Sequence, residues 1–332
     1  MPRSPSVVIV SPALANANNG NWRTARRWQE LLAGDHAVRI TREWPDAEAA
    51  GDAIMLALRA RRSAEPIAAW AQAHPGRGLA VVLTGTDLYQ DIQADAAAQR
   101  SLQLAQRLVV LQECGPEALP VWQRDKARVI YQSTPALPAL PKGDAQLVAV
   151  MVGHLRQVKT PQTLLAAARL LCQRSDIRIR HIGDAAAEPA LGDEARATAR
   201  ECPNYEWLGA LPHAATLEEI RRAHVLVHTS ALEGGAHVIL EAVRCGTPVL
   251  ASRVPGNVGM LGTSYQGYFP HADAGALARL LLACRAGQQA QDPAAGLLGR
   301  LAAQCALRAP LFDAAAERNA LLNLLQELES SP

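Results

Sequence analysis

The sequence predicts an α/β protein built from two Rossmann-like, doubly wound domains. The chain has 332 residues, more than one hydrophobic core normally serves. Short unbroken apolar runs, such as Leu79 to Leu83 and Ala145 to Val152, alternate with helical periodicity, as in parallel sheets buried on both faces. Three prolines in Pro135 to Lys142 predict a linker between the domains. We therefore expect an N-terminal domain over residues 1–134, a linker over 135–144, a second domain over 145–309 and a C-terminal helix over 310–332.

The composition is that of an ordinary soluble globular protein. Hydrophobic residues make up 49% of the chain and the formal net charge is only +2, so nothing favours nucleic-acid binding. The six cysteines form no CxxC pair and no zinc-type spacing with histidine, which favours free thiols in a reducing compartment. We find no leader of signal type and no apolar run of about eighteen residues. A cytoplasmic protein without a stable membrane association is expected.

The N-terminal half begins with a strand, a polar loop and a helix. Ser6 to Val10 is the predicted strand, and the loop extends through Asn16 to Asn21. The helix is expected to start near Trp22, to place Trp28 on its apolar face and to end at Gly34. A strand, a glycine loop and a helix can cradle a phosphate, although no GxGxxG motif is present.

Arginines crowd the first turns of this helix. Arg23, Arg26 and Arg27 lie where the helix dipole disfavours cations, and a bound anion would resolve the conflict. For Arg26 and Arg27 a solvated helix face explains the charges as well. For Arg23, together with the loop residues Asn19, Gly20 and Asn21, we favour binding of an acceptor substrate.

The rest of this half continues the alternation. We expect a strand at Val38 to Ile40, helices at Glu48 to Arg61 and Glu65 to Ala73, and the strand that ends at Leu83. The polar loop that follows contains Asp87, at the carboxyl end of a strand where ligands of open α/β sheets bind. Asp87 is interpreted as a helix cap, a contact to a sugar hydroxyl or a base. The final predicted strands are Leu108 to Leu111 and Arg128 to Tyr131.

The C-terminal half starts with the strand Ala145 to Val152. A loop from Gly153 to Lys159 leads into a predicted helix from Pro161 to Cys172, with proline in its first turn. Further strands, helices and one loop are expected in the remainder of this half. The strands are Arg178 to Gly183 and Asn204 to Leu208, the helices are Leu217 to Arg222, Ala274 to Ala286 and Pro310 to Leu328, and the loop is Asn257 to Gly262.

The stretch from Ala223 to Pro255 predicts a strand, a glycine loop, a helix and a second strand. Val225 to Val227 is a buried strand, and Ser230 to Gly235 interrupt it. The helix is expected from Ala236 to Cys245, and the next strand from Val249 to Ser252. Because the first N–H groups of a helix are free, this turn is a ready anion site that fits a diphosphate.

Two glutamates flank this turn. Glu233 precedes the helix and Glu241 lies within it, with seven residues between them. Alone, such a pair would be an N-terminal charge and a solvated helix face. Because the residues around Glu241 are mostly apolar, a solvated face does not account for it. We therefore interpret both glutamates as site residues, beside the anion site at Gly234 and Gly235.

The run EGGAHVILEAVRCGTPVLAS resembles the C-terminal signature of family 4 retaining-type glycosyltransferases, which have the GT-B fold. The resemblance implies two domains facing across a cleft, and a C-terminal crossover helix that returns to the first domain. It also implies that Glu241 holds the ribose hydroxyls of a nucleotide sugar and that Glu233 lies beside the transferred sugar. Ala236 departs from the family, which usually has a glycine there.

The loop GHLRQVK also resembles this family, in which an arginine after the glycine and a later lysine neutralise the leaving diphosphate. Lys159 matches the lysine. His154 occupies the place of the arginine, and Arg156 is a candidate replacement. The resemblance further places the donor near Ser230 and places the nucleobase near the backbone of Leu208.

The sequence contains no Asp-x-Asp motif, so the metal-dependent alternative architecture has no support. We expect no metal or other cofactor. The diphosphate would be neutralised by Lys159, Arg156 and the helix N-terminus at Gly234 and Gly235.

The runs NNGNWRTARRW, TGTDLYQD, VIYQS and GHLRQVK resemble one branch of these enzymes, the selenosugar synthases of selenoneine biosynthesis. This implies transfer of a glucose or N-acetylglucosamine type sugar from a UDP-sugar to selenophosphate. A small anionic acceptor needs a cationic pocket, for which Arg23 is the candidate. An ionised selenium nucleophile needs no strong general base.

Other functions remain open at this point. A transferase acting on a hydroxyl acceptor would need a base, for which Asp87 is the candidate. A non-catalytic nucleotide-sugar sensor and a nucleotide-sugar epimerase would use the same fold.

Overall fold

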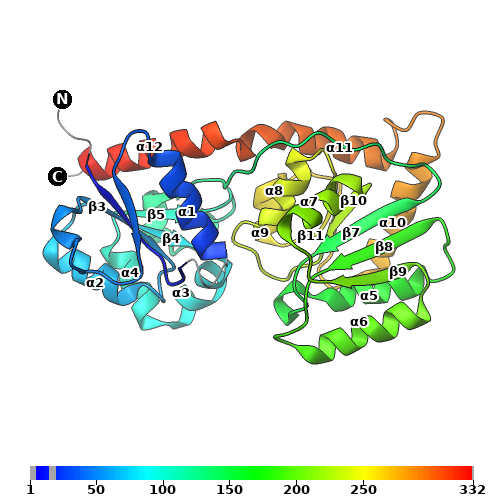
Figure 1. The fold of residues 1–332 in the computed structure, drawn as a ribbon, viewed down its shortest axis with the longest axis horizontal. Helices are drawn as coiled ribbons and strands as arrows, with labels where there is room; N and C mark the ends of the chain where they lie inside the picture. The colour runs from blue at the N-terminus through cyan, green and yellow to red at the C-terminus, as the bar shows by residue number, and fades with distance from the viewer. Residues whose placement is uncertain (1–4, 15–19, 331–332) are drawn as a thin grey trace. The chain divides into compact units, whose positions relative to one another are not determined.

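A computed structural model describes residues 5–14 and 20–330 of the chain. The chain divides into two compact units (Figure 1). The first unit contains residues 1–133 and 313–332, and the second unit contains residues 134–312.

The first unit is a parallel sheet with helices on both faces. Its strands are β1 (Val7–Val10), β2 (Val38–Thr41), β3 (Ile54–Leu58), β4 (Leu79–Leu83), β5 (Arg107–Val110) and β6 (Ala127–Val129). Its helices are α1 (Gly20–Leu32), α2 (Ala64–Ala73), α3 (Ile92–Ala94), α4 (Ala96–Leu104) and α12 (Ala314–Ser330). The strand order is β2-β1-β3-β4-β5-β6, and each neighbouring pair is parallel.

Apolar side chains build one core on each face of this sheet. One core contains Trp28 of α1 together with Leu321 and Leu325 of α12, so the C-terminal helix packs in the first unit beside α1 (Figure 1). The other core contains Trp70 of α2 and Leu102 of α4. Every residue of β1, β3 and β4 is buried, as expected for strands covered on both sides.

The predicted helix from Glu48 to Arg61 is wrong. Ile54–Leu58 is the strand β3, which lies between β1 and β4 in the middle of the sheet. Its sequence, IMLAL, contains Met, Leu and Ala, which are strong helix formers, and a short apolar run has no periodicity that distinguishes the two structures. The segment forms a strand because it is buried on both faces of the sheet, which is a property of the tertiary structure.

The second unit is also a parallel sheet with helices. Its strands are β7 (Leu147–Val152), β8 (Ile177–Ile182), β9 (Tyr205–Gly209), β10 (Val225–His228), β11 (Val249–Ser252) and β12 (Tyr268–Phe269). Its helices are α5 (Pro161–Leu170), α6 (Pro189–Glu201), α7 (His213–Arg222), α8 (His237–Arg244), α9 (Pro255–Leu261), α10 (Ala274–Gln288) and α11 (Leu297–Arg308).

The strand order of the second sheet is β12-β11-β10-β7-β8-β9. The chain therefore runs outward from β7 to β9 and then returns to β10 on the other side of β7. Such a reversal leaves a crevice at the carboxyl ends of the two central strands, where ligands of open α/β sheets bind. Both sheets confirm the predicted doubly wound α/β class.

The expected loop from Asn257 to Gly262 is also wrong, because Pro255–Leu261 forms the helix α9. Two glycines within this short segment, Gly256 and Gly259, hide its helical character in the sequence. The helices α3, α4, α6 and α11 were not predicted.

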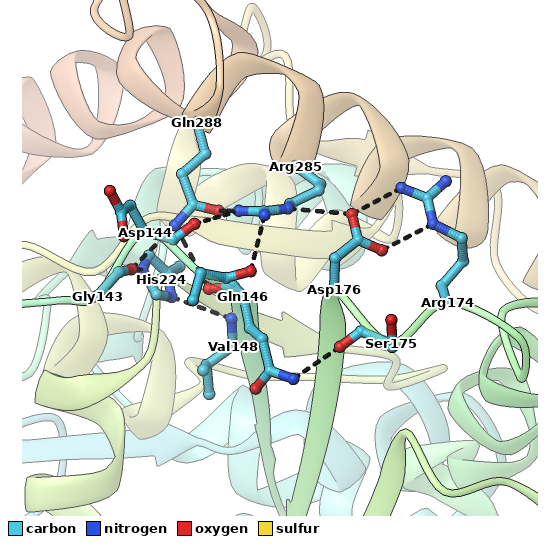
Figure 2. Close-up of polar contacts among 11 residues, drawn as sticks. Gly143, Asp144, Gln146, Val148, Arg174, Ser175, Asp176, His224, Arg285 and Gln288 are labelled. Atoms are coloured by element: carbon cyan, nitrogen blue, oxygen red, sulfur yellow. Dashed lines mark hydrogen bonds and ion pairs between the residues drawn. The ribbon is translucent and has the colours of Figure 1, made fainter.

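Arg285 of α10, whose side chain is 4% exposed, joins the segments that precede β7 and β8 (Figure 2). Its guanidinium donates to the carbonyls of Asp144 and Ala145 and to Asp176 Oδ2. Nearby, His224 Nδ1 accepts from the N–H of Val148 at 3.0 Å. These contacts fix the sheet at the edge opposite the crevice.

No helix in the described ranges has the length and apolar character that a membrane-spanning segment requires.

Candidate functional site

Two loops meet at the carboxyl ends of β7 and β10. Thr229 Oγ1 donates to the carbonyl of Lys159 at 2.6 Å, and the N–H of Ala231 donates to the carbonyl of Val158 at 2.9 Å. These bonds attach the loop after β7 to the loop after β10, as the adjacency of the two strands requires. They bring Lys159 and Glu233 together from distant parts of the sequence.

Lys159 and Glu233 form an ion pair with 2.6 Å between Nζ and Oε1. His228, the last residue of β10, places its Nε2 3.1 Å from the same oxygen. Burial alone would raise the pKa of Glu233, but the charge of Lys159 and the hydrogen bond from His228 outweigh it and hold that pKa well below its usual range. Glu233 is therefore an anion at neutral pH.

The second oxygen of Glu233 is available to a ligand. Oε2 makes no hydrogen bond with any residue that the structure describes, and 11% of the side chain is exposed. The backbone of Glu233 is held tightly, because a Cβ on Gly256 would lie 2.0 Å from the Glu233 carbonyl oxygen. Only glycine permits this approach of α9.

Glu241 lies in the second turn of α8 and is 4% exposed. Its Oε1 is 2.7 Å from Nε2 of His213, the first residue of α7, and 3.5 Å from Nε2 of His237. The carboxylate thus faces two imidazoles and not solvent, as the apolar character of its helix indicated. Both histidines have exposed surface through which a ligand could reach this group.

The glycine turn precedes α8 as predicted, with Gly234 buried and Gly235 partly buried. Ser230 is fully buried, and within the described chain its Oγ has no hydrogen-bond partner. The carbonyl of Ser230 accepts a 2.5 Å bond from Ser252 Oγ, which joins the ends of β10 and β11. Asn257 Nδ2 donates to the same Ser252 hydroxyl at 3.0 Å.

His154 and Arg156 both lie exposed on the loop after β7. His154 Nδ1 is 2.6 Å from Asp184 Oδ2 on the loop after β8. The guanidinium of Arg156 makes no hydrogen bond or ion pair with a described residue. It is therefore a free cation close in sequence to Lys159.

Leu208 lies at an irregularity of the edge strand β9. The register pairs His181 with Trp207 but Ile182 with Gly209, so Leu208 is the extra residue of a β-bulge. A bulged residue on an edge strand has backbone groups that the ladder does not use. This is the property required of a backbone that meets a nucleobase.

The acceptor residues predicted for the first unit have mixed outcomes. Asn19 lies outside the described residues. Gly20 and Asn21 belong to α1, which begins two residues earlier than expected. Arg23 is exposed and has no partner in the part of the chain that the structure describes. It therefore retains the unbalanced charge that suggested an anion.

The other two arginines of this helix are paired. Arg26 contacts Glu30 at 2.8 Å on the surface, and Arg27 contacts the buried Glu317 of α12 at 2.9 Å. For these residues the explanation without a ligand is the one that the geometry favours.

Asp87 is fully buried in the first unit. Its Oδ2 accepts hydrogen bonds from the N–H and the hydroxyl of Thr84, at 3.0 and 2.7 Å, and Arg59 Nε lies 3.5 Å away. Burial raises the pKa of Asp87 although the Thr84 hydrogen bonds and the Arg59 charge oppose this shift. Asp87 is inside a π-helical turn, Asp87–Asp91, and not before it. This placement favours a structural role over ligand contact.

Sequence reasoning missed four site residues: His213, His228, His237 and Asp184. Of these, His237 had a local signal, because it precedes Glu241 by four residues and so shares its helix face. His228 contacts Glu233 across the short loop that follows β10, Asp184 reaches His154 through strand adjacency, and His213 comes from another helix.

Within the described ranges, no three His, Cys, Asp or Glu side chains are grouped so that they could hold a metal ion.

Residues 136–288 match the family model of the glycosyl transferases group 1. A D-inositol 3-phosphate glycosyltransferase from Corynebacterium glutamicum is 32% identical over 145 residues, which are 40% of this chain and 35% of that protein. Another, from Thermobispora bispora, is 28% identical over 221 residues, or 61% of this chain and 51% of that protein. The chain thus spans about half or less of the length of these curated relatives.

Solved structures resemble the chain over nearly its whole length. Sucrose-phosphate synthase from Thermosynechococcus elongatus has a TM-score of 0.75 at 17% identity, covering 98% of this chain and 100% of that chain. Anabaena HepE, solved in complex with UDP-glucose, has a TM-score of 0.70 at 16% identity with the same coverage, 98% and 100%. Residues 136–288 therefore resemble the glycosyl transferases group 1, and the chain has the GT-B fold.

Proposed function

We propose that this protein is a group 1 glycosyltransferase that uses a UDP-sugar as donor. The observation that carries the proposal is the pair of Lys159 and Glu233 at the crevice of the second sheet, beside the N-terminus of α8. The relatives named D-inositol 3-phosphate glycosyltransferase support sugar transfer, and the neighbour bound to UDP-glucose supports this class of donor.

The donor diphosphate would bind between two sources of positive charge. One is the loop with Arg156 and Lys159, and the other is the set of free N–H groups at the start of α8. These groups can neutralise the leaving diphosphate, so we propose that the transfer needs no metal ion. Full activity in the presence of EDTA is the expected result.

The nucleoside would extend from the diphosphate towards β9. In this assignment Glu241 accepts hydrogen bonds from the ribose hydroxyls, and the bulge at Leu208 offers its backbone to the base. Oε2 of Glu233 would accept a hydrogen bond from the transferred sugar, because an ionised carboxylate can only accept. Ser230, with an unused buried hydroxyl, would lie behind this position.

We further propose selenophosphate as the acceptor. The support is the sequence resemblance, the free charge of Arg23, and the burial of Asp87, which removes the one base suggested for a hydroxyl acceptor. In the reaction a bond forms between selenium and the anomeric carbon, and the bond from that carbon to the diphosphate breaks with its electron pair, releasing UDP. An ionised selenium nucleophile needs no proton removed.

Mass spectrometry tests both the proposed donor and the proposed acceptor. The purified protein is mixed with UDP-glucose or UDP-N-acetylglucosamine, with and without selenophosphate generated in place. UDP together with a sugar that contains selenium is the expected result. UDP release without a selenium product would keep the transferase and exclude this acceptor, and a panel of hydroxyl acceptors would follow. Binding of the donor without any turnover would favour a nucleotide-sugar sensor.

A further inference from the structure

The contact between His154 and Asp184 fixes which nitrogen of the imidazole carries a proton. Nδ1 lies 2.6 Å from Asp184 Oδ2, and two acceptors cannot approach so closely without a shared hydrogen. The N–H of Asp184 also lies 3.3 Å from Nδ1, which is the longer and weaker contact of the two. Oδ1 of the same carboxylate accepts from the N–H of Ala186 at 3.0 Å, so Asp184 is held in place from both sides. His154 therefore donates from Nδ1, and Nε2 is the nitrogen left for a ligand.

The backbone holds these two residues together. A Cβ on Gly183 would lie 2.0 Å from the carbonyl oxygen of Gly153, so only glycine lets the loops after β7 and β8 approach. The N–H of Leu155 donates to the carbonyl of Asp184 at 2.8 Å. Within the described chain Nε2 of His154 has no partner, and the side chain is 54% exposed.

The free nitrogen has two chemical states. In the neutral ring, with its hydrogen on Nδ1, Nε2 carries a lone pair and repels a phosphate oxygen. In the imidazolium, Nε2 donates a charged hydrogen bond to that oxygen. Asp184 holds the hydrogen on Nδ1. The neutral ring therefore has no hydrogen on Nε2 to donate to the phosphate. A phosphate oxygen that contacts Nε2 therefore binds to the imidazolium and not to the neutral ring.

We propose that Asp184 is a positioning residue that makes nucleoside diphosphate binding at His154 depend on the uptake of one proton. The proposal rests on the diphosphate site proposed above. It explains how a histidine can serve where a permanent cation is expected, because the ligand itself brings the imidazole into its charged state. Donor affinity then falls as pH rises, because binding takes up a proton and the free proton concentration decreases.

Charged groups around His154 come from three loops. Its own loop contributes Arg156 and Lys159, and the loop after β8 contributes Asp184 and Glu188, whose carboxylate accepts from the N–H of Gln157. The loop after β10 contributes Glu233, which is paired with Lys159. Ordinary guanidinium, ammonium and carboxyl groups have pKa values far from neutrality, whereas that of imidazole lies near it, so the proposal assigns the proton to His154.

Isothermal titration calorimetry with UDP tests the proposal. The binding enthalpy is measured at about pH 8, above the ordinary pKa of imidazole, in two buffers of different ionisation enthalpy. We expect net uptake approaching one proton for each UDP bound, and affinity that falls by up to about tenfold per pH unit above neutrality. UDP is the probe, so catalysis is not needed.

Three variants separate the proposal from its rivals. His154→Arg has a permanent cation and should bind UDP with no proton uptake and little pH dependence. Asp184→Asn lets the ring adopt its other neutral tautomer and should also lose most of the uptake, an effect that a merely structural role would not produce. His36→Gln, in the first unit, is the matched control and should behave as the wild type. If His154→Arg is not folded by circular dichroism, His154→Asn replaces it and should bind UDP weakly without uptake.

The outcomes are distinguishable. If the wild type does not bind UDP, the proposed function fails. If UDP binds without proton uptake, or if uptake persists in His154→Arg, the proposal about Asp184 is overturned while the donor assignment stands. Persistent uptake would point to His213 and His237, which contact Glu241.

Discussion

Removing the Lys159 side chain should have two separable effects, one on folding and one on the reaction. In Lys159→Ala the anionic Glu233 keeps the hydrogen bond from His228 but loses the ammonium 2.6 Å away. Leaving a buried charge without its partner costs about 3–5 kcal/mol when no other group compensates. Because His228 remains and the Lys159 side chain is 30% exposed, we expect a smaller loss of about 1–3 kcal/mol.

The effect on the reaction follows from the place of the charge. The leaving diphosphate gains negative charge as its bond breaks, so a cation beside it stabilises the transition state more than the bound donor. Removing one such group typically lowers kcat by roughly 10²–10³-fold. We expect Lys159→Ala to lie in this range, with a much smaller change in donor affinity.

The control is the double variant Lys159→Ala with Glu233→Gln. It removes the uncompensated charge, so the free energy of unfolding in urea should recover most of the loss seen in Lys159→Ala. UDP release should stay low, because the cation is still absent. If Lys159→Ala unfolds like the wild type and the double variant is no more stable, the ion pair does not have the energy assigned to it. Wild-type kcat in Lys159→Ala would refute its role at the diphosphate.

Three further predictions concern other parts of the chain. Glu241→Ala should raise the donor KM with a smaller change in kcat, because contacts to the ribose are made equally in the ground and transition states; an unchanged KM would contradict this assignment. Arg23→Ala should raise the KM for an anionic acceptor and leave UDP binding intact, measured by kinetics and calorimetry; equal loss of both would show a structural role. The free energy of unfolding should fall as pH decreases from neutrality, because burial lowers the pKa of His181 to about 4 and also lowers the pKa of His224, so that the unfolded chain binds protons first. For His181 the loss between about pH 7 and pH 5 is about 2 kcal/mol, and urea denaturation of His181→Gln should show a weaker pH dependence.

Elements with a local sequence pattern were predicted correctly. The stretch around α8 has a strand, a glycine turn, an apolar helix and a stop at Gly246, and the structure follows this order closely. The prediction at β3 failed because the run IMLAL has no periodicity. This segment is a strand because it is buried between two other strands. The prediction at α9 failed because Gly256 is explained by its close approach to Glu233, a contact between segments that no local pattern shows.

In the candidate site, too, some residues could be recognised from the local sequence and others could not. Glu233 and Glu241 could be selected from the sequence, because their turn and helix are contiguous. Lys159 could be selected as well, but the histidines were missed: His228 precedes Glu233 on the same segment, and His213 comes from another helix. Asp184 meets His154 only because β7 and β8 are neighbours in the sheet. Strand order, which no local pattern encodes, therefore brings Lys159 to Glu233 and Asp184 to His154.

The geometry of Lys159 and Glu233 also constrains how they could act together. Oε1 of Glu233 is occupied by Lys159 and His228, while Oε2 is unused by the described residues. An ammonium has three donors, and Lys159 uses one of them on Glu233, so it can contact a phosphate oxygen without breaking the pair. A ligand at this contact would therefore meet a donor with positive charge and an acceptor with negative charge a few ångströms apart. That polarity matches the breaking of a glycosidic bond, in which the diphosphate oxygen gains negative charge and the anomeric carbon gains positive charge. Glu233→Gln would keep the shape and remove the polarity, so it should lower kcat while donor binding and the fold are retained.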